Sequence, residues 1–225
     1  MPPLAVILPA AGSSTRFGRN KLIEPLLGES VLMRTIRAFL AHPEVGTVVM
    51  ATNDAEMCKT VNSLGAGKIL YAPGGATRAQ SVRNALQTVP AEFEWVAVHD
   101  AARPLVSREL IDRTLAAAVE HGSAVPAMPV ALTIKQATAP LPAKVQRTVP
   151  RHELWAMQTP QIARRTDLLD AFDRCPIPWS EVTDDVQLLE LIGKDVWLVP
   201  GEERNLKITT PLDLKLAEIL LREIS

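Results

Sequence analysis

Short apolar runs alternate with segments of helical spacing along most of the chain. The runs are rich in aliphatic residues and are expected to form buried strands at Leu4–Leu8, Thr47–Ala51, Lys68–Tyr71, Trp95–His99 and Val196–Val199. After Ser30, apolar residues recur on roughly one helical face at Val31, Leu32, Ile36, Phe39 and Leu40. Because strands and helices alternate, we expect an α/β fold of three layers, with a mostly parallel central sheet and right-handed crossovers.

Helix-start signals stand where this alternation requires them. Ser30, either Asn53 or Asp54, and Ser107 are residue types that cap a helix N-terminus, and the helix after Ser107 is expected to continue through Glu120. Another helix is expected from about Thr77 to Val89. Thr210-Pro211 opens the last helix, since proline is favoured at the first helical position.

One segment interrupts the pattern. Ser123–Val130, Leu132–Gln136 and Val145–Val149 are strand-like, and the intervening Ala137–Lys144 is rich in Pro and Ala. We therefore expect a single domain over residues 1–225 with a protruding two-stranded arm at about residues 131–150. A lone hairpin is marginally stable in water, so the arm needs a surface to pack on, and a second subunit is the expected partner.

Composition and charge narrow the classes of protein. The 225 residues are 47% hydrophobic but only 4% aromatic, which predicts an aliphatic core. The formal net charge is -1, so the chain lacks the excess of basic residues with which nucleic-acid binders contact phosphates, and any recognition of anions must be local.

No apolar run approaches the ~20 residues of a membrane span, and Leu4–Ala11 lacks the basic start of a signal peptide. A cytoplasmic location without membrane contact is expected, with Cys58 and Cys175 as separate buried thiols.

The polar loops that follow the predicted strands are the candidate sites, because ligands of such sheets bind beyond the carboxyl ends of the strands. The first loop, Pro9–Lys21, contains small residues whose backbone N–H groups can approach an anion closely, together with Arg16 and Lys21. It matches neither the phosphate loop that ends in Gly-Lys-Ser/Thr nor the dinucleotide G-x-G-x-x-G pattern. A solvated surface loop with incidental basic residues is the alternative.

The second and third loops add glycines and a carboxylate. Gly74-Gly75-Ala76-Thr77-Arg78 leads to Ser81, and the glycines leave room for a base or a sugar against the backbone, although Ser81 could equally be a simple helix-start residue. His99–Pro104 offers Asp100 for a metal ion or a ribose hydroxyl and Arg103 for a phosphate. The alternative there is an Asp–Arg pair that closes a turn.

These motifs resemble those of the 2-C-methyl-D-erythritol 4-phosphate cytidylyltransferases of the non-mevalonate isoprenoid pathway. The resemblance covers nearly the whole chain in family order, through Leu8–Gly12, Arg16, Lys21, Gly74-Gly75, Arg78, Ser81, Val98–Pro104, Thr133, Arg151, Trp155, Thr159–Gln161, Thr183-Asp184 and Asn205–Thr209. It implies a Rossmann-like nucleotidyltransferase sheet, a homodimer held by the hairpin arm, and CTP with Mg²⁺ as the activated donor.

The resemblance also implies roles for individual residues. Arg16 and Lys21 would stabilise the transition state, and Arg151 and Lys207 would position the phosphate of the acceptor, a small phosphorylated polyol. Arg103, Thr133 and Thr183 would assist in acceptor binding, with Thr133 and Arg151 serving the neighbouring subunit's site. CTP would contact Pro9, Ala10, Ala11, Gly12, Gly75, Ala76, Ser81, Asp100 and Ala101. The Mg²⁺ ion would be held mainly by the CTP phosphates, with Asp100 as a possible ligand.

Some positions depart from the family pattern. Ala76 stands where relatives often carry an acid, Arg204 stands where some relatives do, and Leu132 replaces a polar residue that commonly precedes Thr133. If a side chain at position 76 is needed to read cytosine, selectivity for CTP is open.

The expected reaction is a direct transfer. No histidine has a Ser or Cys partner in a recognisable motif, so a covalent intermediate is not expected. The acceptor's phosphate, whose second pKa is near ~6, is largely a dianion at neutral pH and can attack the α-phosphorus of CTP itself. The rival interpretations are a ribitol-5-phosphate cytidylyltransferase, a sugar-1-phosphate nucleotidyltransferase that uses UTP or GTP, and a non-catalytic nucleotide-sensing module on the same fold.

Overall fold

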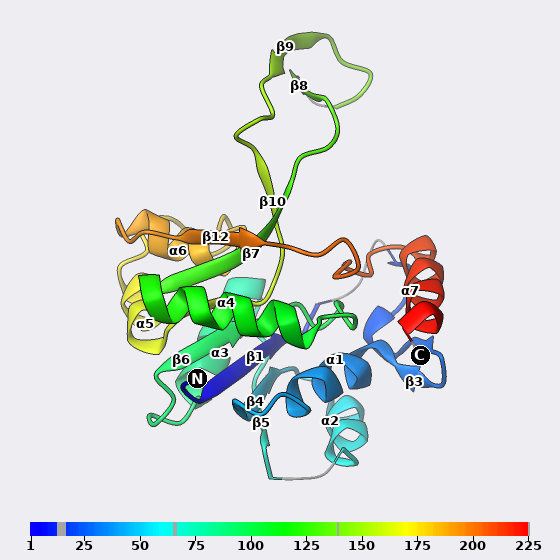
Figure 1. Ribbon diagram of the computed structural model, residues 1–225, viewed down its shortest axis with the longest axis vertical. Coiled ribbons are helices and arrows are strands. Elements are labelled where there is room, and N and C mark those ends of the chain that lie inside the picture. Colours follow the sequence, from blue (N-terminus) through cyan, green and yellow to red (C-terminus); the bar gives the residue numbers. More distant parts are fainter. Residues whose placement is uncertain (13–16, 65–66, 139, 225) are drawn as a thin grey trace.

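The computed structural model describes residues 1–12, 17–64, 67–138 and 140–224, and within these ranges the chain forms three layers with a projecting arm (Figure 1). The middle layer is an eight-stranded sheet in the order β10-β7-β11-β6-β1-β4-β5, with β12 also paired to β7. Its strands are β1 (Leu4–Pro9), β4 (Val45–Ala51), β5 (Ile69–Ala72), β6 (Trp95–Val98), β7 (Ser123–Pro129), β10 (Trp155–Met157), β11 (Gln161–Arg164) and β12 (Trp197–Pro200).

Most of the sheet is parallel. The pairs β1–β4, β1–β6, β4–β5 and β7–β12 are parallel, whereas β11 runs antiparallel to both β6 and β7, and β10 runs antiparallel to β7. The strands β12, β7, β6, β1, β4 and β5 therefore point the same way and present their carboxyl ends at one edge. This is the geometry predicted from the alternation of strands and helices.

Helices cover both faces of the sheet. On one face lie α1 (Val31–Leu40), α2 (Ala55–Asn62) and α4 (Arg108–His121), and on the other α3 (Arg78–Thr88), α5 (Arg165–Asp173) and α6 (Asp185–Leu191). The side chains of β1 alternate between these layers, since Val6 packs with Ile36 of α1 in one core cluster and Ile7 with Leu86 of α3 in the other. All four side chains are fully buried, and truncating such a residue to Ala typically costs about 2–5 kcal/mol.

A group of short elements packs at one end of the molecule, beside the loop that follows β1. The 3-10 helix η2 (Lys21–Ile23) and the short strands β2 (Pro25–Leu26) and β3 (Glu29–Ser30) lead into α1. The last helix, α7 (Pro211–Ile224), packs there in a cluster that includes Phe17, Leu26 and Ile208. Among the described residues, no helix combines the length and apolarity that crossing a bilayer requires.

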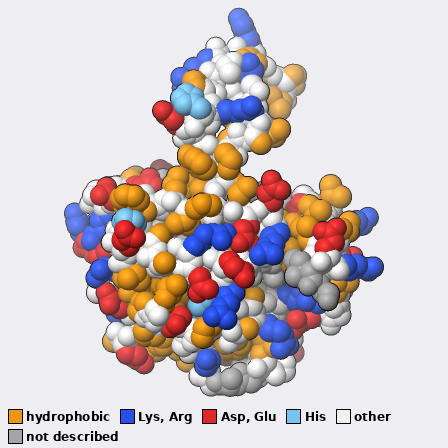
Figure 2. Space-filling model, viewed as in Figure 1, with side chains coloured by type: hydrophobic (Ala, Val, Ile, Leu, Met, Phe, Trp, Pro, Cys, Tyr) orange, Lys and Arg blue, Asp and Glu red, His pale blue; other side chains and the backbone are white. Residues whose placement is uncertain are grey.

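The predicted hairpin is present and stands clear of the rest of the chain (Figure 1). Its strands β8 (Ile134–Ala137) and β9 (Val145–Val149) form a separate antiparallel sheet, and most of their residues are exposed. At the junction of the arm with the body, hydrophobic side chains gather on the surface (Figure 2), and Trp155 of β10, opposite Pro129, is 45% exposed.

The helix caps confirm the predicted starts. The hydroxyls of Ser30 and Ser107 accept hydrogen bonds from the backbone N–H groups of Met33 and Leu110, at 3.3 and 3.0 Å. Asp54, rather than Asn53, caps α2, because Asn53 instead holds the backbone of Gly74 in the second loop. The strands β10 and β11 and the helices α5 and α6 were not predicted from the pattern.

Candidate active site

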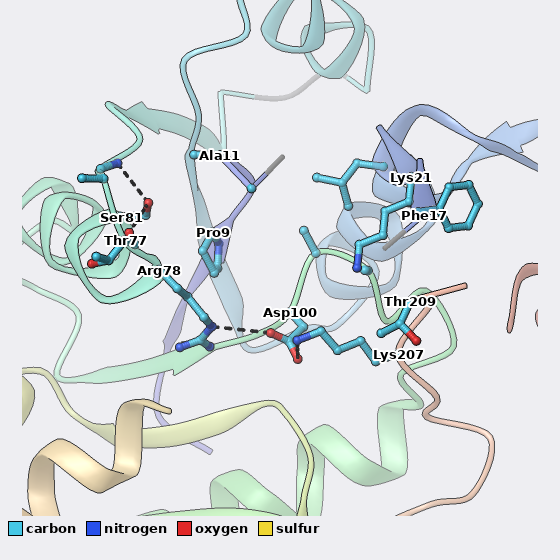
Figure 3. A pocket seen from close by; sticks show the side chains of 16 residues that line it. Pro9, Ala11, Phe17, Lys21, Thr77, Arg78, Ser81, Asp100, Lys207 and Thr209 are labelled. Atoms are coloured by element: carbon cyan, nitrogen blue, oxygen red, sulfur yellow. Dashed lines mark hydrogen bonds and ion pairs between the residues drawn. The ribbon is translucent and has the colours of Figure 1, made fainter. Parts of the chain in front are cut away.

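A cavity of about 530 Å³ opens at the edge of the sheet where the parallel strands end (Figure 3). Loops that follow β1, β5, β6 and β12 converge on it. Its lining residues are Pro9, Ala11, Gly12, Phe17, Lys21, Leu22, Gly75, Ala76, Thr77, Arg78, Ser81, Asp100, Ala101, Ala102, Lys207 and Thr209. The expectation that the polar loops meet at one edge is therefore confirmed.

The loop after β1 supplies one wall of the cavity. Pro9, Ala11 and Gly12 line the cavity, whereas the side chain of Ala10 is buried in the core, so Ala10 can meet a ligand only through its backbone. Lys21 begins η2, whose N-terminus is capped by the side chain of Asn20. In Figure 3, Lys21 extends into the cavity from the side opposite Arg78. Arg16 lies outside the described residues.

The loop after β5 is held in shape by short contacts. A side chain at Gly75 would overlap Gln80 and would lie 2.9 Å from the Gln80 carbonyl carbon, so this position requires glycine. The Ser81 hydroxyl accepts a hydrogen bond from the Gly75 N–H and donates one to the Thr77 carbonyl, both at 3.0 Å. Ser81 thus lines the cavity, as predicted, and at the same time fixes the loop that carries Gly75.

Asp100, directly after β6, is the only carboxylate among the described residues that line the cavity. Its Oδ2 lies 3.1 Å from both Lys207 Nζ and Arg103 Nε, and its Oδ1 lies 3.6 Å from Arg78 Nε. Burial alone would raise the pKa of Asp100, but the positive charges of Lys207, Arg78 and Arg103 outweigh it and hold the pKa below its ordinary value. The carboxylate therefore stays ionised and keeps these cations gathered at the floor.

Arg78 was part of the family resemblance, but the sequence assigned it no role. Its guanidinium bridges two acids, since Nη2 lies 2.7 Å from Asp185 Oδ2 at the start of α6 and Nε faces Asp100. Burial lowers the pKa of Arg78, but the carboxylates, Asp185 first, more than compensate and raise it above its ordinary value. Arg78 is the first residue of α3, and a cation is unfavourable at a helix N-terminus unless it faces an anion. Its position in the sequence therefore indicates that Arg78 contacts a negatively charged group.

Arg103 differs from the expectation. It does not line the cavity, because it lies beneath the floor and is only 9% exposed, with Nη1 donating to the Asn205 carbonyl at 2.8 Å. Its backbone N–H also donates to the Asp100 carbonyl at 3.0 Å. The structure thus matches the alternative interpretation, in which an Asp–Arg pair closes a turn.

A neutral histidine supports this turn. His99 is fully buried, and burial lowers its pKa to about 3. The neutral ring donates from Nε2 to the Arg103 carbonyl at 3.1 Å and accepts at Nδ1 from the Thr159 hydroxyl at 3.0 Å. The same hydroxyl oxygen accepts the Asp100 N–H at 3.1 Å, so Thr159, in the segment between β10 and β11, holds the loop after β6 that forms the floor.

The remaining predicted residues lie outside the cavity of their own chain. Thr133 and Arg151 are exposed on the arm, where Arg151 donates to the Ala131 carbonyl. Thr183 is exposed before α6, and its hydroxyl donates to Gln187 Oε1 at 3.0 Å. Lys207, by contrast, lines the cavity with Thr209. The loop that carries Lys207 follows the predicted strand Val196–Val199, so the rule that ligands bind beyond strand ends could also have singled it out.

The described lining carries more positive than negative charge. It includes the cations Lys21, Arg78 and Lys207 and one carboxylate, Asp100, although the whole chain has a net charge of -1. Among the residues that the structure describes, no group of three or more His, Cys, Asp or Glu side chains could hold a metal ion. The excess of positive charge in the described lining suits the cavity to a polyanion.

Comparisons with known proteins agree on one family. A family model described as IspD, 2-C-methyl-D-erythritol 4-phosphate cytidylyltransferase, matches residues 4–223. The enzyme of that name from Symbiobacterium thermophilum is 42% identical over 98% of this chain and 94% of its own, and that from Solibacter usitatus is 38% identical over 98% and 96%. The crystal structure of the Thermus thermophilus enzyme matches at a TM-score of 0.79, with 34% identity over 98% of this chain and 99% of that one.

Proposed function

The chain belongs to the 2-C-methyl-D-erythritol 4-phosphate cytidylyltransferase family, and we propose that the cationic cavity at the edge of its sheet is where the family's reaction takes place. The reaction transfers CMP from CTP to 2-C-methyl-D-erythritol 4-phosphate and gives 4-diphosphocytidyl-2-C-methyl-D-erythritol and pyrophosphate. The observation that carries the proposal is the convergence of Lys21, Arg78 and Lys207, from three separate segments of the chain, on one cavity in a chain without net positive charge.

The chemistry needs no nucleophile from the protein. An oxygen of the acceptor's phosphate attacks the α-phosphorus of CTP, the bond from that phosphorus to the bridging oxygen breaks, and the electron pair leaves with pyrophosphate. Ser81 is the only serine in the described lining, and its hydroxyl is engaged in holding the loop after β5. His99 is neutral and fully buried, and it bonds to the floor rather than facing the ligand.

The barrier is electrostatic, since one phosphate must approach another. Fixed positive groups in a partly enclosed site lower such a barrier because they need no reorganisation when the charge moves. In the proposed arrangement, Lys21 and Arg16 face the α-phosphate of CTP, and Lys207 holds the phosphate of the acceptor. Asp100 keeps Lys207 in place before the acceptor binds, at 3.1 Å from its ammonium.

The nucleotide is proposed to lie between the loops after β1 and β5. The backbone of Ala10, Ala11 and Gly12 suits the triphosphate, and Gly75 with Ser81 suits the cytosine. Ala76 is exposed at the rim and offers no polar side-chain atom to the base. Selectivity for CTP then rests on backbone groups in this loop.

The donor is proposed to bind as its Mg²⁺ complex. Asp100 is the only carboxylate of the described lining, and both of its oxygens face cations, so most of the ligands of the ion would come from the triphosphate. When bound, the ion would neutralise part of the phosphate charge. The donor set therefore fits a metal ion that enters with CTP, with Asp100 as its one available carboxylate.

A homodimer is proposed to complete each site. The hairpin β8–β9 is mostly exposed, and β10, next to the arm, presents Trp155 and Met157 to the surface. A second copy of the chain would cover these side chains. It would also bring Thr133 and Arg151 of its arm to the neighbouring cavity, which neither residue reaches in its own chain.

Pyrophosphate release tests the proposed function. The protein is incubated with Mg²⁺, each NTP in turn, and either methylerythritol 4-phosphate or ribitol 5-phosphate. Release only from CTP with methylerythritol phosphate is expected. Release that is fastest with ribitol phosphate or with another NTP would reassign the substrate, and no release from any pair would favour a sensing module.

A further inference from the structure

The segment that carries Lys207 has no regular secondary structure to fix it. Residues 201–209 follow β12 and precede α7 without forming a helix or a strand. Near Lys207, the backbone is joined to the floor of the cavity by the Ile208 N–H, which donates to the Ala102 carbonyl at 2.9 Å. The position of the ammonium therefore depends on how the preceding residues are held.

Gln158, which follows β10 directly, holds these residues with both ends of its amide. Its Nε2 donates to the Glu202 carbonyl at 2.7 Å, and its Oε1 accepts from the Glu202 N–H at 3.1 Å. The same Oε1 accepts from Asn205 Nδ2 at 3.2 Å. Gln158 is 8% exposed and Asn205 is fully buried, so water cannot easily replace these bonds.

Neighbouring residues fix the turn that Gln158 holds and leave room for its amide. The Asn205 N–H donates to the Glu202 carbonyl at 3.1 Å and closes a turn, and Asn205 Nδ2 also donates to the Thr159 carbonyl at 2.8 Å. A side chain at Gly201 would lie 2.8 Å from Gln158 Oε1, so glycine at this position leaves room for the amide. Gln158 itself does not line the cavity and can affect bound ligands only through the segment that it holds.

We propose that Gln158 is a positioning residue for the transfer reaction: by clamping the turn from Glu202 to Asn205, it sets where Lys207 presents its ammonium to the acceptor's phosphate. The inference rests on the proposed role of Lys207 in acceptor binding. Without the amide, the Glu202 N–H loses its partner and the Glu202 carbonyl keeps only the Asn205 N–H, so the turn must move toward water to regain the lost hydrogen bonds. Lys207 moves with it, whereas none of these bonds involves Lys21 or the loop after β5.

A double-mutant cycle tests the inference, because residues that act through one another are not additive. Gln158→Met keeps the length of the side chain and removes both hydrogen-bonding groups. Alone, it is expected to raise the acceptor KM about tenfold, the size of a typical coupling between contacting residues, and to leave the KM for CTP unchanged. In the Lys207→Ala background, the same substitution is expected to change the acceptor KM little, since the ammonium that Gln158 positions is absent.

The outcomes separate this inference from the proposed function. If Lys207→Ala raises the acceptor KM and Gln158→Met raises it by the same factor in both backgrounds, Gln158 does not act through Lys207 and the inference is wrong. If Lys207→Ala leaves the acceptor KM unchanged, the role of Lys207 itself is wrong. Ser123→Ala is the matched control, because Ser123 is buried and its hydroxyl donates to the Asp195 carbonyl at 2.9 Å, ahead of β12 and away from Lys207. Its acceptor KM should equal that of the wild type.

A second variant, Gln158→Glu, tests the inference even if Gln158→Met fails to fold. Gln158→Glu keeps the shape and one acceptor, but its ionised carboxylate cannot donate to the Glu202 carbonyl. Protonation restores a donor, and burial favours the protonated form. Relative to the wild type at the same pH, its rise in acceptor KM should be smaller at about pH 6 than at about pH 8. A rise that is equal at both values, or absent at both, contradicts the inference.

Discussion

Asp100 and the cations around it define how single residues act in this cavity. A buried carboxylate is costly unless opposite charges compensate it, and here Lys207, Arg78 and Arg103 do so. Two of these cations, Arg78 and Lys207, also line the cavity, so the ion pairs that stabilise Asp100 hold positive groups ready for a ligand. An incoming phosphate then meets charges that are already in place, which is the condition for electrostatic catalysis.

Substituting Lys21 should affect the chemical step more than nucleotide binding. Lys21→Ala is expected to lower kcat by about 10²–10³, the usual cost of losing one preorganised transition-state donor, with a smaller effect on the KM for CTP. Steady-state kinetics provides the measurement, and Lys59→Ala, an exposed lysine of α2 paired with Glu56, is the control. A raised KM for CTP with unchanged kcat would reassign Lys21 to ground-state binding. The sequence predicts the same result for Arg16→Ala.

Burial of neutral His99 should make stability depend on pH. Its pKa is about 3 in the folded protein and 6.5 as an ordinary value, so between these values the unfolded chain binds a proton that the folded chain excludes. The free energy of unfolding should therefore fall as the pH drops below about 6.5, by up to about 1.4 kcal/mol per pH unit from this residue. Asp100, whose pKa is lowered from 3.8, adds its loss only in more acidic solution.

Urea denaturation at several pH values between about 4.5 and 6.5 measures this dependence. His99→Gln should show a shallower slope than the wild type, because the substituted side chain does not titrate. His152→Gln, at a histidine whose side chain is 74% exposed, should leave the slope unchanged. Equal slopes for the wild type and His99→Gln would show that His99 does not contribute.

At the scale of elements, the sequence predicted the positions of the cavity loops better than the tertiary contacts that these loops make. The aliphatic runs were enough to place β1, β4, β5, β6 and β12, and parallel strands put their following loops at one edge, where the cavity lies. The sequence could not show that Arg103 lies beneath the floor, because its partner, the Asn205 carbonyl, is distant in the chain. The clamp by Gln158 was hidden for the same reason.

The elements that were not predicted are short and lack a clear apolar period. β10 has three residues and β11 four, and Pro160 separates them, so neither offers a run long enough to recognise. The helix α6 has seven residues, and α5 begins without a side-chain cap. Both helices are fixed by tertiary packing on the sheet, through residues such as Phe172 and Leu189. Their positions depend mainly on long-range contacts, although α6 has one local signal, since the side chain of Asp184 caps it by accepting from the Gln187 N–H at 3.0 Å.

The loop after β5 provides a test at this scale. In Gly75→Ala, the added methyl group would overlap Gln80, and the loop would have to move away from α3. The hydrogen bond from the Gly75 N–H to Ser81 would be lost with it. We expect the KM for CTP to rise about tenfold, as one buried hydrogen bond accounts for about that factor, while the acceptor KM stays near its wild-type value. A change confined to the acceptor KM would place cytosine elsewhere.

The whole molecule is unusual in extending an exposed hairpin from a packed body (Figure 1). The arm carries Thr133 and Arg151 away from the cavity of their own chain, and the family resemblance assigns them to the cavity of a neighbouring subunit. In a homodimer, this distance has a function, because each cavity would receive these residues from its partner. A site built from two chains can be tested by placing one substitution in the body and another in the arm, on different chains.

Mixing two impaired variants should restore activity if the arm serves the neighbouring cavity. Lys21→Ala removes a cation of the body and Arg151→Ala removes one of the arm. In a mixed dimer, one site combines an intact body with an intact arm, so activity should return after the two variants are unfolded and refolded together. Each variant refolded alone is the control. No recovery, in samples whose light scattering confirms mixed dimers, would mean that Arg151 does not act across the dimer.

The most direct test of the proposed transfer follows the phosphorus atoms themselves. With CTP, Mg²⁺ and methylerythritol 4-phosphate, ³¹P NMR should show the diphosphate signals of the cytidylated product and free pyrophosphate growing together. In Lys21→Ala/Lys207→Ala, both should grow far more slowly, because two cations of the cavity are removed. Product formation at an undiminished rate in this variant would contradict the proposal that positive charge in the cavity drives the transfer.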